Sequence, residues 1–161
     1  MEASFVALRA MLYMTGFIFF FGWLALRVRA LDSSLGAALP DASKWPGVVL
    51  MSVGGLLVLA CAGIFIARGH GTPAVFDPPR KFVASGPYRF VRNPMYAGGL
   101  ALLAGFGLLQ RSPAILLFAV AMFALFHVFV LFVEEPGLQR RFGESYVAYK
   151  QLVNRWIPKC G

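Results

Sequence analysis

The sequence contains few charged residues, and few of these are acidic. Of its 161 residues, 14% are charged, with seven Asp and Glu against 15 Lys and Arg, while 59% are hydrophobic. An average soluble domain has about 25% charged and about 45–50% apolar residues. The deficit excludes an ordinary cytosolic enzyme and an intrinsically disordered chain. The length is that of a single domain, which we expect to cover residues 1–161.

Cysteine is also scarce. Cys61 lies inside an apolar run and Cys160 lies next to the end of the chain. Their separation fits neither a disulfide framework nor a metal site. These observations exclude a secreted disulfide scaffold, and we expect no metal ligands.

The charge balance is strongly positive, with a formal net charge of +8. In a soluble protein such a charge would favour nucleic acid as a partner. Here no basic and aromatic cluster or nucleic-acid-binding motif accompanies it, and basic loops on one side of a membrane explain it more simply. We therefore expect no nucleic-acid partner.

Long apolar runs are abundant instead. A membrane-spanning helix needs about 20 apolar residues, and three runs approach or exceed this length. A fourth run is shorter, but it extends back to Pro94, since proline is tolerated in the first turn of a helix. We predict an all-α integral membrane bundle of four transmembrane helices at residues 5–26, 48–67, 94–110 and 113–135.

One short connection defines how the last two predicted helices are arranged. The segment Gln-Arg-Ser-Pro at 110–113 predicts a tight turn, so the third and fourth helices should form an antiparallel hairpin. No basic segment precedes the first apolar run and no small-residue cleavage site follows it, so we expect this run to be a helix and not a signal peptide.

Basic residues are unevenly divided between the two ends of the predicted bundle. Ten lie in the loop at 68–93 and the tail at 136–161, and four lie in the other connections. The positive-inside rule therefore predicts that both termini, this loop and this tail lie on the cytoplasmic side. We expect the inner membrane of a bacterium. The ten are Arg68, Arg80, Lys81, Arg89, Arg92, Arg140, Arg141, Lys150, Arg155 and Lys159, and the four are Arg27, Arg29, Lys44 and Arg111.

The first polar block whose residues suit ligand binding runs from Ser85 to Gly99. Pro94 should open a helix, whose first turn has free N–H groups and the positive end of the helix dipole, and this suits a carboxylate or phosphate. Gly98 and Gly99 would let a ligand or another helix approach the backbone closely. The alternative is that both glycines serve helix packing and that the arginines of the block are surface anchors.

The second block is Glu134-Glu135, at the end of the last apolar run. Two carboxylates at a helix C-terminus oppose the helix dipole, so they indicate a bound cation or arginine partners from the loop. Simple ion pairing with Arg89 or Arg92 is the plainer alternative. His127 lies seven residues earlier, on the same helical face as Glu134, and either a functional role or a hydrogen bond to a neighbouring helix explains it.

The tail contains a third pattern, in which apolar and aromatic residues recur at helical spacing. We predict an amphipathic helix that lies in the membrane interface and folds back over the cytoplasmic mouth of the bundle. Trp156 should follow it as an anchor at the level of the lipid headgroups. The recurring residues are Leu138, Phe142, Tyr146, Tyr149 and Val153.

These blocks together resemble the C-terminal signature of integral membrane methyltransferases that use S-adenosylmethionine (SAM). This superfamily includes isoprenylcysteine carboxyl methyltransferases and phospholipid N-methyltransferases. The resemblance covers residues 85–158 and is specific because two blocks occur in order around a hairpin. It rests on Gly86-Pro87-Tyr88-Arg89, Arg92-Asn93-Pro94, Tyr96 and Gly98, followed by Glu134-Glu135, Leu138, Phe142-Gly143, Tyr146, Tyr149, Arg155 and Pro158.

The resemblance implies a SAM site at the cytoplasmic face, between the loop, the Glu-Glu pair and the tail. It implies catalytic roles for Arg92, Asn93 and Glu134. Asn93 stands where the commonest family pattern has His, and Asn can hydrogen-bond a ligand but cannot accept a proton near neutral pH. The implied cofactor contacts are Tyr88, Arg92, Asn93, Pro94, Tyr96, Gly98, Gly99, Glu134, Glu135, Tyr146, Tyr149 and Arg155.

The implied function is methyl transfer from SAM to a membrane-embedded or amphipathic acceptor, either a lipid amine or an isoprenylcysteine-type carboxylate. The acceptor would arrive laterally from the lipid, and Asp77 in the proline-rich part of the loop would either contact it or simply set the path of the chain. The alternative is a non-catalytic four-helix protein, such as a small transporter or assembly subunit. Such a protein needs polar residues through the bundle, whereas only Arg9 and His127 are ionisable within the predicted spans.

Overall fold

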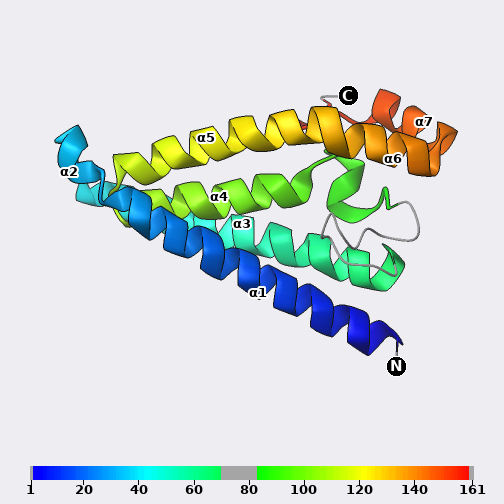
Figure 1. Cartoon of the computed structure of the whole chain (residues 1–161), viewed down its shortest axis with the longest axis horizontal. Coiled ribbons are helices and arrows are strands. Elements are labelled where there is room, and N and C mark those ends of the chain that lie inside the picture. The colour runs from blue at the N-terminus through cyan, green and yellow to red at the C-terminus, as the bar shows by residue number, and fades with distance from the viewer. Residues whose placement is uncertain (1, 70–82, 160–161) are drawn as a thin grey trace.

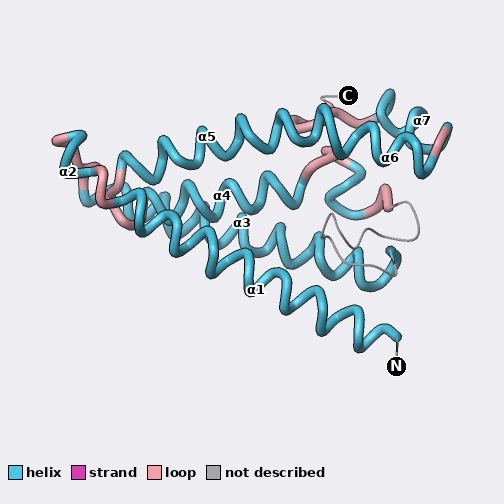
Figure 2. Tube along the Cα trace, in the orientation of Figure 1, coloured by secondary structure: helices cyan, strands magenta, loops and turns pink. Residues whose placement is uncertain are grey.

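The computed structural model describes residues 2–69 and 83–159, and the regular structure in these two ranges is helical apart from one isolated bridge (Figure 2). Residues 70–82, half of the sequence-predicted loop at 68–93, therefore fall outside the described residues, and so do Asp77 and Cys160. The longer helices are α1 (Glu2–Arg29), α3 (Lys44–Ile64), α4 (Pro94–Leu109) and α5 (Pro113–Phe129).

Shorter elements connect or extend these helices. Two of them, η2 and η4, are single π-helical turns that continue α3 and α5. They are α2 (Asp32–Leu35), η1 (Asp41–Ser43), η2 (Phe65–Gly69), η3 (Gly86–Arg89), η4 (Val130–Glu134), α6 (Glu135–Phe142) and α7 (Glu144–Leu152).

Three helical stretches are long and apolar enough to cross a membrane. They are Met11–Leu35, Asp41–Ala67 and Pro113–Phe142. The remaining apolar helix, α4, has 16 residues, which corresponds to about 24 Å at 1.5 Å per residue. The sequence prediction of a helical membrane protein is thus confirmed, and length alone supports three of the four predicted spans.

Backbone contact between α3 and α4 holds the centre of the bundle together. Glycines recur every seventh residue on both helices, at Gly47 and Gly54 of α3 and at Gly98 and Gly105 of α4. A Cβ atom at Gly54 would lie 2.7 Å from the carbonyl oxygen of Gly98, and one at Gly47 would lie 2.8 Å from that of Gly105. The two helices therefore approach as closely as glycine allows, which is a common mode of packing in membranes.

We expect Gly54→Ala to lower the free energy of unfolding by about 1–3 kcal/mol, because the added methyl group overpacks a backbone contact that cannot yield. Gly63→Ala is the matched control, since a Cβ atom at Gly63 of the same helix meets nothing within 4 Å. Thermal unfolding of the two purified variants in detergent would measure the difference. Equal melting temperatures would contradict the close packing of α3 on α4.

The turn between α4 and α5 forms the antiparallel hairpin that the sequence predicts. Ser112 caps α5 by accepting a hydrogen bond from the N–H of Ile115 at 3.1 Å, and Asp32 accepts one from the N–H of Ala114 at 2.9 Å. Arg111 has a positive φ of 56°, and its Nε donates to the carbonyl oxygen of Leu39 at 2.7 Å. These contacts satisfy donors that a helix start otherwise leaves free.

Pro136 explains the π-helical turn before α6. A proline has no N–H, and its ring displaces the carbonyl four residues earlier, here that of Phe132 in η4. Inserting one wider turn keeps the helix running from α5 into α6, so the last long helix continues to Phe142.

The predicted amphipathic helix is interrupted at Gly143. This glycine has φ 54° and ψ −134°, a conformation that side chains rarely adopt. The chain therefore forms two helices, α6 and α7, in place of one. The five residues of the predicted stripe still come together, because Leu138 and Phe142 of α6 pack against Tyr146, Tyr149 and Val153 across the break.

Figure 1 shows where the polar segments lie. The start of α1, the end of α3, the start of α4, and both α6 and α7 are at one end of the bundle. The turn between α4 and α5 and the short α2 are at the other. The fold thus brings the first two polar blocks of the sequence, Ser85 to Gly99 and Glu134-Glu135, to one end.

Candidate functional site

The tail is joined to the segment before α4 by backbone hydrogen bonds. The N–H of Arg92 donates to the carbonyl oxygen of Asn154 at 2.8 Å, and the N–H of Asn93 donates to that of Arg155 at 3.3 Å. Val91 and Asn154 form an isolated parallel bridge. The Nδ2 atom of Asn93 adds a hydrogen bond to the carbonyl oxygen of Arg155 at 3.3 Å. This backbone pairing brings together residues about 60 positions apart in the sequence. No local sequence signal indicates the pairing.

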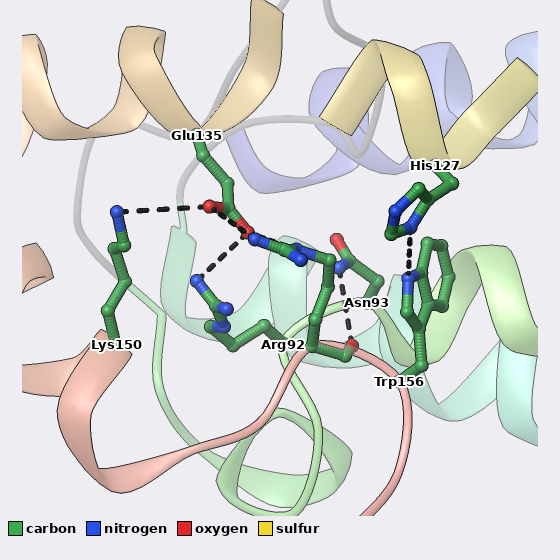
Figure 3. A network of polar contacts seen from close by, with 7 residues as sticks. Arg92, Asn93, His127, Glu135, Lys150 and Trp156 are labelled. Carbon is green, nitrogen blue, oxygen red and sulfur yellow. Dashed lines mark hydrogen bonds and ion pairs between the residues drawn. The ribbon is translucent and has the colours of Figure 1, made fainter. Parts of the chain in front are cut away.

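Glu135 is the centre of a buried ionic cluster (Figure 3). Its Oε1 atom lies 2.7 Å from Nε of Arg155 and 2.9 Å from Nη1 of Arg92, and its Oε2 atom lies 3.8 Å from Nζ of Lys150. The side chain of Glu135 is 7% exposed and that of Arg92 is 10% exposed. The arginine partners expected for the Glu-Glu pair are therefore present, and Arg92, not Arg89, is the partner from the loop.

Glu134 has a different environment from its neighbour. Its Oε2 atom accepts a hydrogen bond from the hydroxyl of Tyr96 in α4 at 2.8 Å. Among the described residues, no Lys or Arg forms an ion pair with it. The two adjacent carboxylates thus have different partners: Glu135 meets a group of cations, and Glu134 meets a hydroxyl.

Three buried tyrosines lie on the segments that meet here: Tyr146 and Tyr149 in the tail, and Tyr88, which packs with Cys61 and Val83. The Tyr149 hydroxyl donates to the backbone carbonyl of Tyr88, and Tyr146 packs on Tyr149 with 6.2 Å between ring centroids. Burial, reinforced by the carboxylate of Glu135, raises the pKa of Tyr146 to about 12. Burial likewise raises the pKa values of Tyr88 and Tyr149. These hydroxyls therefore stay protonated near neutral pH, and that of Tyr149 joins the tail to the segment before α4.

The beginning of α4 supplies the remaining sequence-predicted residues. Pro94 is fully buried at its first position, and no side chain caps the helix start. Gly98 faces α3, where a Cβ atom would lie 2.9 Å from the carbonyl oxygen of Gly54. At Gly98 the geometry therefore supports the packing explanation. At Gly99 a Cβ atom would meet nothing within 4 Å, so this glycine leaves open space beside the helix.

His127 of α5 forms a further contact with the tail. The Nε1–H of Trp156 donates to Nδ1 of His127 at 2.9 Å (Figure 3), and the Trp156 ring packs edge-on against Phe123 at 5.2 Å. Of the two explanations open for His127, the geometry supports a structural hydrogen bond. The sequence placed Trp156 at the lipid headgroups but gave no reason to pair it with this histidine.

We expect Trp156→Phe to loosen the tail without unfolding the bundle. The variant keeps an aromatic ring but loses the indole donor, which should cost about 1 kcal/mol. Hydrogen exchange at residues 153–157 should therefore rise, while exchange in α3 and α4 stays the same. Leu152→Ala is a suitable control, because Leu152 is exposed at the end of α7; equal protection in Trp156→Phe and wild-type protein would contradict the role of this contact.

Comparison with known proteins is consistent with this arrangement. A family model described as phospholipid methyltransferase matches residues 42–145, which includes α3 to α6 and ends before the tail contacts. Over 71 residues the chain is 38% identical to a phosphatidylethanolamine N-methyltransferase of Pyrenophora tritici-repentis, covering 44% of this chain and 8% of that protein. It is 39% identical over 70 residues to a phosphatidylethanolamine N-methyltransferase of Talaromyces marneffei, covering 44% of this chain and 7% of that protein. The matched segment is thus less than a tenth of the length of these relatives.

Proposed function

Since the chain belongs to the phospholipid methyltransferase family, we propose that it transfers a methyl group from SAM to the amine of a membrane phospholipid. The observation that carries the proposal is that the two adjacent glutamates, Glu134 and Glu135, have different partners. Glu135 sits among three cations, and Glu134, beside it, has a hydroxyl partner and no cation among the described residues. Both carboxylates lie at the end of an apolar helix, where a lipid amine would be found.

The side chains at this end fit the charges of SAM, which bears a carboxylate, an ammonium and a sulfonium. The Nε atom of Arg92 is buried and has no hydrogen-bond partner in the described part of the chain, so it can meet a carboxylate. The uncapped start of α4 offers backbone N–H groups for the same purpose. The carboxylate of Glu134 can meet a positive group, and the open space at Gly99 admits a ligand close to the helix.

We assign the sequence-predicted residues to two tasks. Arg92, Asn93, Tyr96, Gly99 and Glu134 would contact the cofactor or the reacting groups. A second set would hold these residues in place by joining the loop, the tail and α3. The second set is Tyr88, Pro94, Gly98, Glu135, Tyr146, Tyr149 and Arg155.

Methyl transfer to an amine requires little dedicated chemistry from the protein. SAM supplies an electrophilic methyl group on a sulfonium. The acceptor amine must lose a proton to expose its lone pair, and Glu134, which has no cation partner among the described residues, would accept that proton. Tyr96 keeps Glu134 oriented by its hydrogen bond of 2.8 Å. The remaining contribution is alignment and exclusion of water, to which the docked tail would contribute.

We further propose that α4 crosses the membrane as the fourth span, that α7 lies in the interface, and that the site faces the cytoplasm. The support is the apolar character of α4 and the excess of Lys and Arg at the end that carries α6 and α7.

Incubation of the purified protein with labelled SAM and phosphatidylethanolamine vesicles tests the proposal, with mass spectrometry of the extracted lipid as readout. We expect methylated phosphatidylethanolamine. If SAM binds but an isoprenylcysteine analogue is methylated and phosphatidylethanolamine is not, the acceptor is a carboxylate and the lipid-amine proposal is wrong. If folded protein binds no SAM at millimolar concentration, the enzyme function is contradicted.

A further inference from the structure

A hollow of about 500 Å³ lies between α6 and α7 and borders the ionic cluster at Glu135 and Lys150. Leu131 and Pro136 form its apolar part. Gln139, Arg140 and Lys150 form its polar part, and Glu135 contributes from the ionic cluster. The volume is within the range of small-ligand sites, which is about 300–1,000 Å³.

The hollow lies at the boundary between an apolar and a charged surface. Immediately before it, Phe132 of η4 is 74% exposed and Val133 is 50% exposed, as expected for residues that face lipid. The polar part of the lining includes Gln139 and Arg140 of α6, which are both exposed. An amphipathic molecule in the membrane surface can therefore reach the hollow with its apolar part still in the lipid.

Cations outnumber carboxylates around this hollow. Arg92, Arg155 and Lys150 approach Glu135, and Arg140 adds a fourth cation that has no ion-pair partner among the described residues. Even when Glu134 is counted as ionised, cations exceed carboxylates by two. An excess of positive charge next to a low-dielectric surface favours a bound anion, and arginine suits a phosphate because its planar donors match two oxygens.

We propose that Arg140 and Lys150 bind the phosphate of the phospholipid acceptor, with Gln139 as an additional donor. This inference rests on the proposed function, because it supplies the subsite that distinguishes a phospholipid from any other lipid amine. The headgroup phosphate would be held in the hollow at Arg140. Glu135 lines the same hollow and Glu134 is the residue before it in the chain, so the amine would extend past Glu135 toward Glu134.

Binding of short-chain phosphatidylethanolamine to the full chain in detergent, measured by calorimetry, tests the subsite without requiring methyl transfer. Arg140→Gln should weaken binding about tenfold, as expected for the loss of one charge-assisted contact, and Lys150→Gln should weaken it similarly. Arg141→Gln is the matched control: Arg141 is the next residue of the same helix, is exposed, lies over the ring of Phe142 and does not line the hollow.

Three outcomes would overturn the proposal. Equal weakening by Arg140→Gln and Arg141→Gln would indicate general attraction to the membrane surface. Unchanged binding in Arg140→Gln would exclude the subsite. Binding of inorganic phosphate as tight as that of the lipid, with the same dependence on Arg140, would indicate a site for the free anion.

An activity measurement separates this proposal from the proposed function. With dodecylamine, which lacks a phosphate, Arg140→Gln should leave the KM unchanged, whereas with short-chain phosphatidylethanolamine it should raise the KM about tenfold and leave kcat nearly unaltered. If the wild-type protein binds phosphatidylethanolamine through Arg140 but transfers no methyl group from SAM to either amine, the subsite stands and the proposed function fails.

Discussion

Glu135→Gln is expected to lower the free energy of unfolding by about 3–5 kcal/mol, the loss typical of removing one partner from a buried ion pair. The side chain of Glu135 is 7% exposed and neutralises Arg92, which is 10% exposed, together with Arg155 and Lys150. Glutamine keeps the shape of the side chain but leaves three cations facing one another. Chemical denaturation in detergent, or thermal unfolding, would measure the effect.

Two further variants make this expectation specific. Glu144→Gln removes an exposed carboxylate at the start of α7 and should change stability by less than about 0.5 kcal/mol. Combining Glu135→Gln with Arg92→Gln should recover part of the loss, because the double variant no longer buries an unpaired guanidinium. A stable Glu135→Gln protein would show that the cluster around Glu135 is not the element that holds the tail to the bundle.

Glu134→Gln is expected to reduce methyl transfer by about 100-fold or more, a typical contribution of a general base, while the protein remains as stable as wild type. Glutamine can still accept the hydrogen bond of Tyr96, and among the described residues no Lys or Arg would lose an ion pair. The carboxylate that would receive the amine proton is absent, however. Methyl transfer to phosphatidylethanolamine and the melting temperature, measured on the same preparation, would check both parts.

Comparing the activity and stability of variants at Tyr96, Glu134 and Glu135 tests the roles assigned to the two glutamates. Tyr96→Phe should reduce methyl transfer less than Glu134→Gln does, because it removes the orienting hydrogen bond and leaves the carboxylate. A Glu134→Gln protein with wild-type kcat would exclude Glu134 as the base. If Glu134→Gln unfolds the protein and Glu135→Gln does not, the roles assigned to the two carboxylates are reversed.

Local patterns predicted much of the helical framework. The apolar runs located α1, α3, α4 and α5. A segment that crosses a membrane must satisfy its backbone hydrogen bonds internally, so it forms a helix, and its length and apolar composition can be recognised in the sequence. The tight turn predicted at 110–113 located the start of α5 at Pro113. The break between α6 and α7 was not predicted, since the apolar residues keep helical spacing through Gly143 and only its positive φ ends the helix.

The sequence by itself determined that this is a helical membrane protein whose charged residues gather at one end. Apolar length and charge distribution are local quantities, and they require no knowledge of packing. Only the tertiary structure decided what each polar residue does there. Glu134 and Glu135 are adjacent and chemically identical, yet one meets Tyr96 and the other meets Arg92 and Arg155. Those partners come from α4, the segment before it and the tail, and which carboxylate faces which segment depends on the helix rotation set by η4 and on the docking of the tail.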